Sequence, residues 1–191
     1  KRRQSRLRSL IDQARSHSQF YQLRYSGVVP RTLSDLPPVT KSELMAAFDQ
    51  WVCDPALRRK DLESFLARGD ALHTTYRGHL VCSSSGTTGH PGIYVYDAST
   101  VAVFEALALA RIDRAWLRPR DWSALARRGM RWSAAVATGG GYTGEVWMAA
   151  QARRSQWHRK RYRTFSVQRP LPDLVRALND FDPTILTAYA T

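Results

Sequence analysis

Cysteine is scarce in this chain of 191 residues, which contains only Cys53 and Cys82. Two isolated cysteines exclude the disulfide framework that is typical of small secreted domains. No apolar stretch is long enough to cross a bilayer, and the basic start at residues 1–3 is not followed by the apolar run of a secretory signal. We therefore expect a cytoplasmic protein without a membrane partner.

Lysine and asparagine are also rare, although the chain is strongly basic. The 29 basic and 16 acidic residues give a formal net charge of +13, and only four of the basic residues are lysines. Abundant alanine, a single asparagine and evenly spread arginines are explained more simply by GC-rich coding than by a selected binding surface. We therefore do not expect a nucleic-acid partner.

One basic run keeps that alternative open. Residues 153–163 combine clustered cations with Trp157 and Tyr162, and single-stranded nucleic acids are held by such mixtures of cations and stacking rings. Our main expectation for residues 153–163 is a solvated connection that precedes a strand. A basic nucleic-acid-binding domain remains the last of the alternatives.

The scattered histidines do not have the spacing of a metal site. His73, His79, Cys82 and His90 lie within eighteen residues, but no C-x-x-C pair completes a set of ligands. In a strand, His79 and Cys82 would point to opposite faces because their separation is odd. We expect no metal ion bound by protein side chains alone.

The most informative segment is Ser83–Gly92, in which nine of ten residues are Gly, Pro, Ser or Thr. Strand-like runs at residues 79–82 and 93–96 hold this loop at both ends. Its hydroxyls and mobile backbone N–H groups are suited to wrapping an anion, above all a polyphosphate. A flexible linker or a long hairpin turn is the alternative that composition alone leaves open.

Two common nucleotide-binding motifs are excluded. The P-loop needs Lys followed by Ser or Thr after its last glycine, but here Gly89 is followed by His90 and Pro91. A dinucleotide-binding fingerprint needs the spacing G-x-G-x-x-G, which the loop lacks.

Residues 84–91, Ser-Ser-Gly-Thr-Thr-Gly-His-Pro, resemble the signature loop of adenylate-forming enzymes, the acyl- and aryl-CoA ligases and their relatives. In that family the loop holds the terminal phosphates of ATP. The family often has Lys after the proline, whereas this chain has Gly92, as one branch of the family commonly does. The resemblance implies that the ATP phosphates contact Ser83, Ser84, Ser85, Gly86, Thr87, Thr88 and Gly89.

Other segments resemble the phenylacetate–CoA ligase-like branch of that family. They are residues 20–27, 36–44, 92–97, 163–174 and 183–190. The resemblance implies Mg²⁺–ATP as a substrate, an aryl or acyl carboxylic acid as the second substrate, and CoA or a carrier thiol as the acceptor. The family's catalytic Lys is not found in this chain, so we expect an N-terminal portion of a longer enzyme, inactive by itself.

A second glycine-rich turn lies at residues 138–144, after a strand-like run at 131–138. Ligands of open α/β sheets bind beyond the carboxyl ends of the strands, so a substrate or nucleotide pocket is expected at Gly139, Gly140, Gly141 and Tyr142. The alternative is a strand-to-helix turn that needs glycines only for their positive φ. Related enzymes often have His after two glycines, but here Gly141 occupies that position.

Hydrophobic periodicity predicts an α/β fold with a helical N-terminal third, divided into a helical region 1–78 and a nucleotide-binding region 79–191. Helices are expected at 3–17, 98–116, 144–152 and 171–181. A further helix should follow the capping box at Thr40–Glu43, and another should run from a start at Asp54–Pro55 to a stop at Gly69. The later strands, at 131–138, 162–167 and 184–189, should pair in parallel. A non-catalytic nucleotide-binding or interaction module remains an alternative function, and a homodimer remains open.

Overall fold

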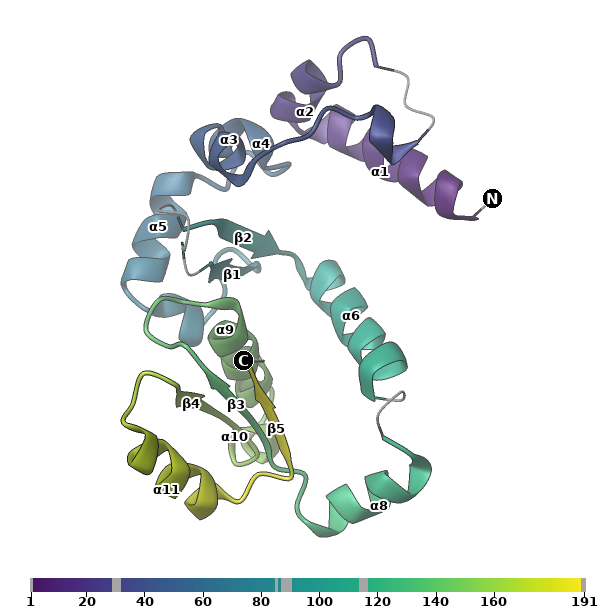
Figure 1. Cartoon of the computed structure of the whole chain (residues 1–191). Helices are drawn as coiled ribbons and strands as arrows, with labels where there is room; N and C mark the ends of the chain where they lie inside the picture. Colours follow the sequence, from purple (N-terminus) through teal and green to yellow (C-terminus); the bar gives the residue numbers. More distant parts are fainter. Residues whose placement is uncertain (1, 29–31, 85, 87–90, 114–116, 190–191) are drawn as a thin grey trace. The chain divides into compact units, whose positions relative to one another are not determined.

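The structure, a computed structural model, describes residues 2–28, 32–84, 86, 91–113 and 117–189. Figure 1 shows an alternation of helices and strands, which confirms the mixed α/β class. The chain divides into two compact units, Lys1–Glu63 and Ser64–Thr191. Among the described residues, no helix has the length and apolar character needed to span a bilayer.

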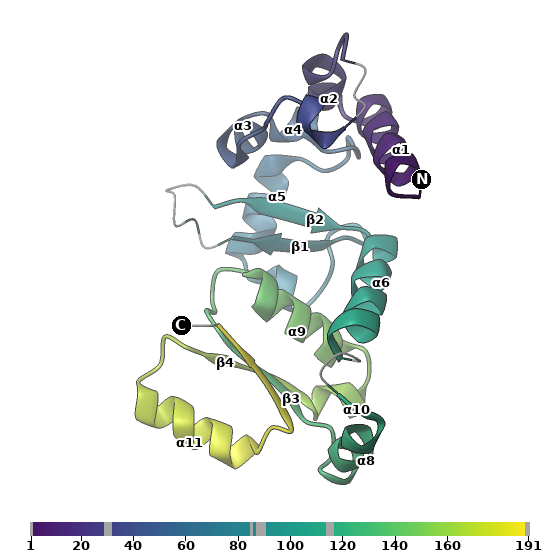
Figure 2. The same ribbon diagram turned by 45° about the vertical axis from the view of Figure 1, so that its right-hand side comes forward.

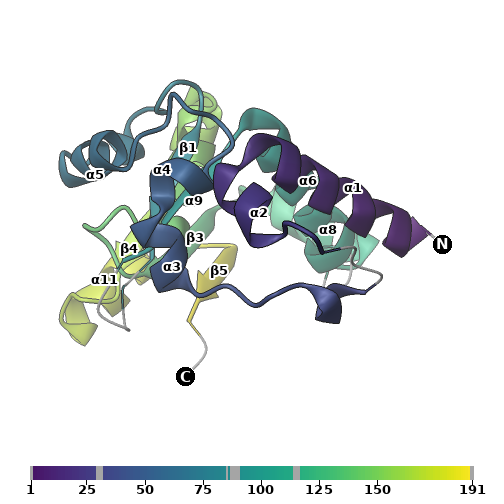
Figure 3. The same cartoon turned by 90° about the horizontal axis from the view of Figure 1, so that it is seen from above.

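The first unit is helical. Its long helix α1 confirms the helix expected at 3–17, and α2 lies beside it in Figure 3. Ser18 lies between the two helices and caps α2, because its buried hydroxyl accepts a hydrogen bond from the N–H of Tyr21. The same hydroxyl donates to the carbonyl of Gln50, which ties the start of α2 to α4. The elements of this unit are α1 (Arg2–His17), α2 (Gln19–Arg24), η1 (Leu33–Asp35), α3 (Lys41–Ala46) and α4 (Phe48–Trp51).

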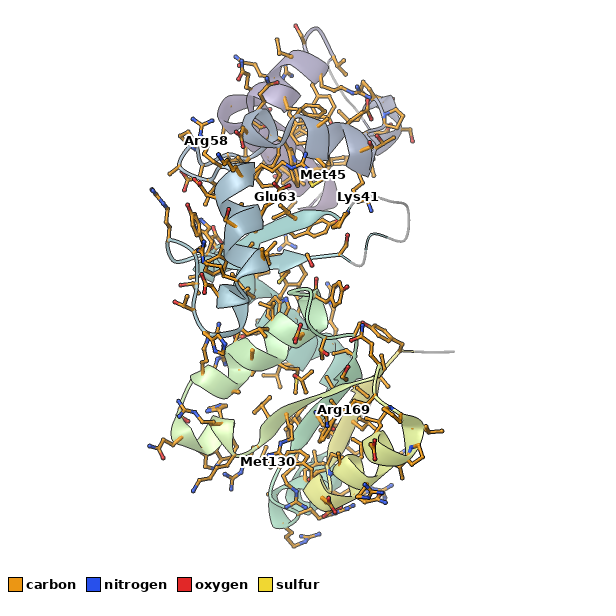
Figure 4. All side chains as sticks on the ribbon, turned by 90° about the vertical axis from the view of Figure 1, so that its left-hand side faces the viewer. Lys41, Met45, Arg58, Glu63, Met130 and Arg169 are labelled. Atoms are coloured by element: carbon orange, nitrogen blue, oxygen red, sulfur yellow. The ribbon has the colours of Figure 1, made fainter. Side chains whose placement is uncertain are left out.

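The predicted capping box is confirmed at the start of α3. The N–H of Glu43 donates to Oγ1 of Thr40 at 3.2 Å, and the N–H of Thr40 donates to Oε2 of Glu43 at 2.7 Å. The helix stops at Ala47, which has a non-helical φ of −103° and ψ of 28°, and α4 begins immediately afterwards. The break lets both Met45, labelled in Figure 4, and Phe48 reach the core.

The predicted helix start at Asp54–Pro55 is wrong. Asp54 instead closes a turn by accepting a hydrogen bond from the N–H of Ala56 at 2.9 Å. Helix α5 (Arg59–Ala67) begins later, where the carboxylate of Asp49 accepts the N–H of Arg59 at 2.8 Å. The cap therefore comes from ten residues upstream, beyond the reach of a local motif. The predicted end is confirmed, since Gly69 follows with a φ of +74°.

In the second unit, the end of α5 and the 3₁₀ turn η2 (Asp70–Leu72) precede a hairpin. Strands β1 (Leu80–Ser83) and β2 (Ile93–Tyr96) confirm the two runs that flank the Ser/Thr/Gly loop. They pair antiparallel, with Val81 opposite Val95, and stand apart from the parallel sheet. A loop without a crossover helix can return the chain only in the antiparallel direction.

A three-stranded parallel sheet confirms the expected pairing of the later strands. Strand β3 (Trp132–Val136) lies between β4 (Tyr162–Ser166) and β5 (Ile185–Ala188). Helix α9 (Thr143–Arg153) connects β3 to β4, and α11 (Leu171–Phe181) connects β4 to β5. With this strand order, right-handed crossovers place the two helices on opposite faces of the sheet. Figure 2 shows both helices beside the strands.

Three further helical segments lie in this unit. The helix expected at 98–116 is α6 (Ala98–Leu107) followed by a π-helical turn at Ala108–Asp113, and residues 114–116 lie outside the described residues. Helix α8 (Pro119–Arg127) was not predicted, although proline is common at a first helical position. The connection expected at 153–163 is largely exposed and leads into β4, and it contains the short helix α10 (Gln156–Arg159). Ser155 caps α10 by accepting the N–H of His158.

Helix α9 carries the central contacts of the second unit, since it packs against β1 as well as β3 and β4. Val146 in its second turn is fully buried, as is Cys82 of β1. The parallel sheet contributes Ala134, Ala135 and Phe165 to the same core. The hairpin and the sheet are thereby held against one helix, and this packing fixes the position of the turn from which α9 starts.

The capping box generates a prediction about pH. The N–H of Thr40 lowers the pKa of the Glu43 carboxyl, together with the Thr40 hydroxyl. A carboxyl with a depressed pKa stabilises the fold above its unfolded-state pKa, and this contribution is lost as pH falls through the folded-state pKa. We therefore expect Glu43→Gln to lower the Tm at pH 7. The difference from the wild type should shrink as pH falls below about 4.3, the ordinary pKa of a glutamate carboxyl, toward the lower folded-state pKa.

Thermal unfolding followed by circular dichroism at several pH values measures this difference. Glu63→Gln is the matched control, because its carboxylate pairs with Arg59 on an exposed helix surface and caps no helix. A Tm difference for Glu43→Gln that stays constant from pH 7 to pH 3 would contradict the prediction.

Candidate functional site

The two glycine-rich segments singled out in the sequence meet in the structure. Ser83, the last residue of β1, donates its backbone N–H to the carbonyl of Gly141 at 2.8 Å. Its hydroxyl donates a short hydrogen bond to the carbonyl of Gly140, and Ser83 also forms a parallel bridge with Tyr142. The base of the Ser/Thr/Gly loop and the turn after β3 therefore form one structure.

Ser84 closes the base of the Ser/Thr/Gly loop. Its N–H donates to the carbonyl of Gly92 at 2.9 Å, and its hydroxyl oxygen accepts the N–H of Gly92 at 2.8 Å. A hydroxyl that accepts one hydrogen bond can still donate its own proton, so Ser84 keeps a donor for an anion. Four predicted phosphate contacts, Ser85, Thr87, Thr88 and Gly89, lie outside the described residues.

Gly86 lies inside the loop, and its backbone conformation favours glycine. Its φ of +65° lies in the left-handed region, and a Cβ there would sit 3.1 Å from the nitrogen of Pro91. A side chain at position 86 would therefore strain the backbone and press on the far side of the loop. Position 86 therefore requires glycine.

The turn that follows β3 also needs its glycines. A Cβ on Gly140 would lie 2.5 Å from Cζ of Tyr142, whose ring folds back against the turn. Gly141 has a φ of +64°, and a Cβ there would lie 2.7 Å from Cδ2 of Leu66. The Tyr142 ring explains Gly140, and Gly139 and Gly141 have the positive φ that the alternative interpretation of the turn expected. The bonds to Ser83 nevertheless bring the turn to the loop.

Glu145 is a residue of this site that the sequence analysis missed. Its carboxylate is buried, with 7% of the residue exposed, and both of its oxygens accept the N–H of Gly139, at 3.2 and 3.1 Å. It lies in the first turn of α9, where the helix dipole favours a negative charge. The signal was present in the sequence, because Glu at the third helical position is part of a common capping pattern.

The carboxyl ends of the parallel strands add further polar groups beside the turn. Oγ1 of Thr138 donates to Oγ of Ser166 at 2.9 Å. The side-chain oxygen of Gln168 accepts the N–H of Thr138, and the hydroxyl of Tyr189 accepts the N–H of Ala137, both at 3.4 Å. Sequence reasoning did not identify Ser166, Gln168 or Tyr189, since only the parallel pairing places their strands side by side.

No protein-family model, curated protein or solved structure matches this chain. The interpretation of the site therefore depends on its own geometry and on the loop sequence.

Cys82 serves the core beneath the site. Burial raises the pKa of its thiol to about 12, although a hydrogen bond with Thr143 acts in the opposite direction. Such a thiol stays protonated at neutral pH, and a protonated thiol is neither a nucleophile nor a metal ligand. Among the described residues, no group of three or more His, Cys, Asp or Glu side chains could hold a metal ion, and His90 lies outside them.

The fit between Gly140 and Tyr142 can be tested by a double-mutant cycle. Gly140→Ala should destabilise the protein by about 1–3 kcal/mol, the usual cost of overpacking, because its Cβ overlaps the tyrosine ring. Combining Gly140→Ala with Tyr142→Ala should recover most of that loss. Urea denaturation of the four proteins in the cycle measures the coupling, and strictly additive effects would show that the ring does not limit position 140.

The two thiols should differ sharply in reactivity. At pH 8, a disulfide reagent such as DTNB should label the exposed Cys53 and leave the buried Cys82 unmodified. Unfolding in guanidinium chloride should expose both thiols. Labelling of two thiols in the native protein at the same rate would mean that β1 is not packed as described.

Proposed function

We propose that this chain carries the ATP-phosphate-binding part of an enzyme that activates carboxylic acids as acyl-adenylates. The observation that supports the proposal most is the pair of hydrogen bonds from Ser83 to Gly140 and Gly141. They join a loop with a phosphate-binding composition to the carboxyl edge of a parallel sheet, where ligands of α/β proteins bind.

The chemistry requires a loop of this kind. A carboxylate is a poor acyl donor because its oxygen is too basic to leave. In the proposed reaction, a carboxylate oxygen attacks the α-phosphorus of Mg²⁺–ATP, the bond to the β-phosphate oxygen breaks, and pyrophosphate departs. A thiolate of CoA or of a carrier then attacks the acyl carbon and displaces AMP, which leaves a thioester.

The loop residues would act on the departing pyrophosphate. The Ser84 hydroxyl and the backbone N–H groups of the loop would hold the β- and γ-phosphates, and Gly86 lets the backbone approach them closely. Donors that are already oriented stabilise the charge that develops on the leaving group without further rearrangement. Mg²⁺ would arrive with the nucleotide.

The acid would lie at the turn that follows β3. Gly139 has open space around the position of a Cβ, Gly140 and Gly141 are covered by Tyr142 and Leu66, and the hydroxyls of Thr138 and Ser166 flank the turn. The carboxylate of Glu145 is engaged by the N–H of Gly139, so it shapes this turn and is not itself directed at a substrate. The nature of the acid, aryl or acyl, would be decided by the side chains around this edge.

The proposal predicts that Gly86→Val abolishes nucleotide-dependent behaviour while the protein stays folded. Mg²⁺–ATP at 100 times its Kd should stabilise the wild-type chain by about 2.7 kcal/mol, which raises the Tm, and Gly86→Val should lose this rise. In the intact enzyme, the same variant should lose acid-dependent exchange of pyrophosphate into ATP.

Gly78→Val is the matched control for this variant. Gly78 has a φ of +83° and open space around the position of a Cβ, so valine there imposes similar backbone strain away from the loop. It should keep the response to Mg²⁺–ATP. Unchanged exchange by a folded Gly86→Val enzyme would refute the assignment, whereas ATP binding without acid-dependent exchange would indicate a non-catalytic nucleotide-binding module.

A further inference from the structure

The amino-terminal end of the parallel sheet gathers basic segments from three places in the chain. The end of α8, the start of β3 and the turn from α10 into β4 meet here, next to Met130, which Figure 4 labels. Nε of Arg161 donates to the carbonyl of Gly129 at 2.9 Å, and the N–H of Trp132 donates to the carbonyl of Arg161 at 2.7 Å. These bonds hold the three segments together.

Several arginines of this region are used inside the protein. Arg128 and Arg131 both pair with Asp182, and Arg154 pairs with Glu105. Arg153 donates to the carbonyls of the 3₁₀ turn η2 (Asp70–Leu72). These four cations are therefore structural and are not free to hold a ligand.

Two neighbouring cations remain exposed. Arg159 and Lys160 close α10, and within the described part of the chain neither side chain has a hydrogen-bond or ion-pair partner. They follow directly after the aromatic residues of α10. An uncompensated positive charge next to exposed rings attracts an anion that also has a flat surface to stack.

Four rings form a continuous row beside these cations. Centroids of consecutive rings are 5.0 Å apart from Trp157 to His158, 5.7 Å from His158 to Tyr162, and 6.1 Å from Tyr162 to Trp132. The last two rings lie nearly parallel, at 8°. The guanidinium of Arg161 sits 4.2 Å from the ring centroid of Trp157, whose indole is still 45% exposed.

We propose that this surface, Trp132, Trp157–Arg161 and Tyr162, binds single-stranded nucleic acid. A row of rings beside two unpaired cations offers stacking to bases and charge to the phosphates that link them. The row extends beyond the length of one base, which favours a strand over a single nucleotide. We expected no such partner because GC-rich coding accounts for the number of arginines. It does not account for a row of contacting rings beside two exposed cations.

This binding would be independent of the proposed acid activation. The aromatic row lies at the amino-terminal ends of β3 and β4, whereas the Ser83–Gly141 contact lies beyond the carboxyl end of β3. Either activity can therefore fail without the other. The alignment of the rings also depends on β3–β4 pairing, because Trp132 and Tyr162 are register partners in the sheet.

Fluorescence anisotropy of a labelled twelve-nucleotide oligothymidine, titrated with the 191-residue chain, tests the proposal. The affinity should fall at least about tenfold between 50 and 200 mM NaCl, since cations replace counterions on several phosphates. Arg159→Glu with Lys160→Glu should weaken binding at least about tenfold. Arg6→Glu with Arg8→Glu makes the same change of charge on α1 and should leave the affinity within about twofold.

Substitutions of Trp157 separate stacking from charge. Trp157→Leu should weaken binding at least about fivefold, and Trp157→Phe should retain most of the affinity, because stacking on a ring contributes about 1–3 kcal/mol per base. Far-UV circular dichroism confirms that both variants are folded. The proposal is overturned if the Arg6/Arg8 variant loses as much affinity as the Arg159/Lys160 variant, or if Trp157→Leu binds like the wild type. It is also overturned if a duplex of equal length binds as tightly as the single strand.

Discussion

The hydrogen bonds between Ser83 and the Gly140–Gly141 turn are the constraint on which the second unit depends. They fasten an antiparallel hairpin to a separate parallel sheet, which share no strand pairing of their own among the named strands. Because the acceptors at positions 140 and 141 are backbone carbonyls, any residue type there would supply them, but only glycine fits. The glycines at positions 140 and 141 are therefore needed both for the packing of the turn and for holding the Ser/Thr/Gly loop in place.

Local patterns predicted the elements of this fold better than the contacts between them. The capping box at Thr40, the stop at Gly69 and the three parallel strands follow from short-range signals, and all are present. The predicted start of α5 was wrong because the residue that caps this helix, Asp49, is distant in sequence. Ser83 and Gly140 were each chosen as site residues, but no pattern reveals a bond across 57 positions. Glu145 was overlooked because its role depends on a hydrogen bond from the N–H of Gly139, which only the structure shows.

The two ends of the parallel sheet have opposite electrostatic character. At the carboxyl end, neutral hydroxyls and glycines surround one carboxylate that is already satisfied by a backbone N–H. At the amino end, arginines outnumber acids, and Asp182 alone pairs with both Arg128 and Arg131. Asp182 has a left-handed φ of 48° at the end of α11, so the same residue ends the helix and secures the start of β3. One acidic residue thus neutralises two arginines at the start of the sheet, while Arg159 and Lys160 at the same end stay unpaired among the described residues.

The direct antiparallel pairing of β1 with β2 has a consequence for how such a protein can change over time. Ser83 and Ile93 are paired residues, so the two ends of the Ser/Thr/Gly loop stay about 5 Å apart whatever lies between them. The entropic cost of closing a loop rises only slowly with its length. Insertions or deletions within residues 85–91 would therefore leave the strand register intact, and the loop can be remodelled for a new ligand without redesigning the fold that carries it.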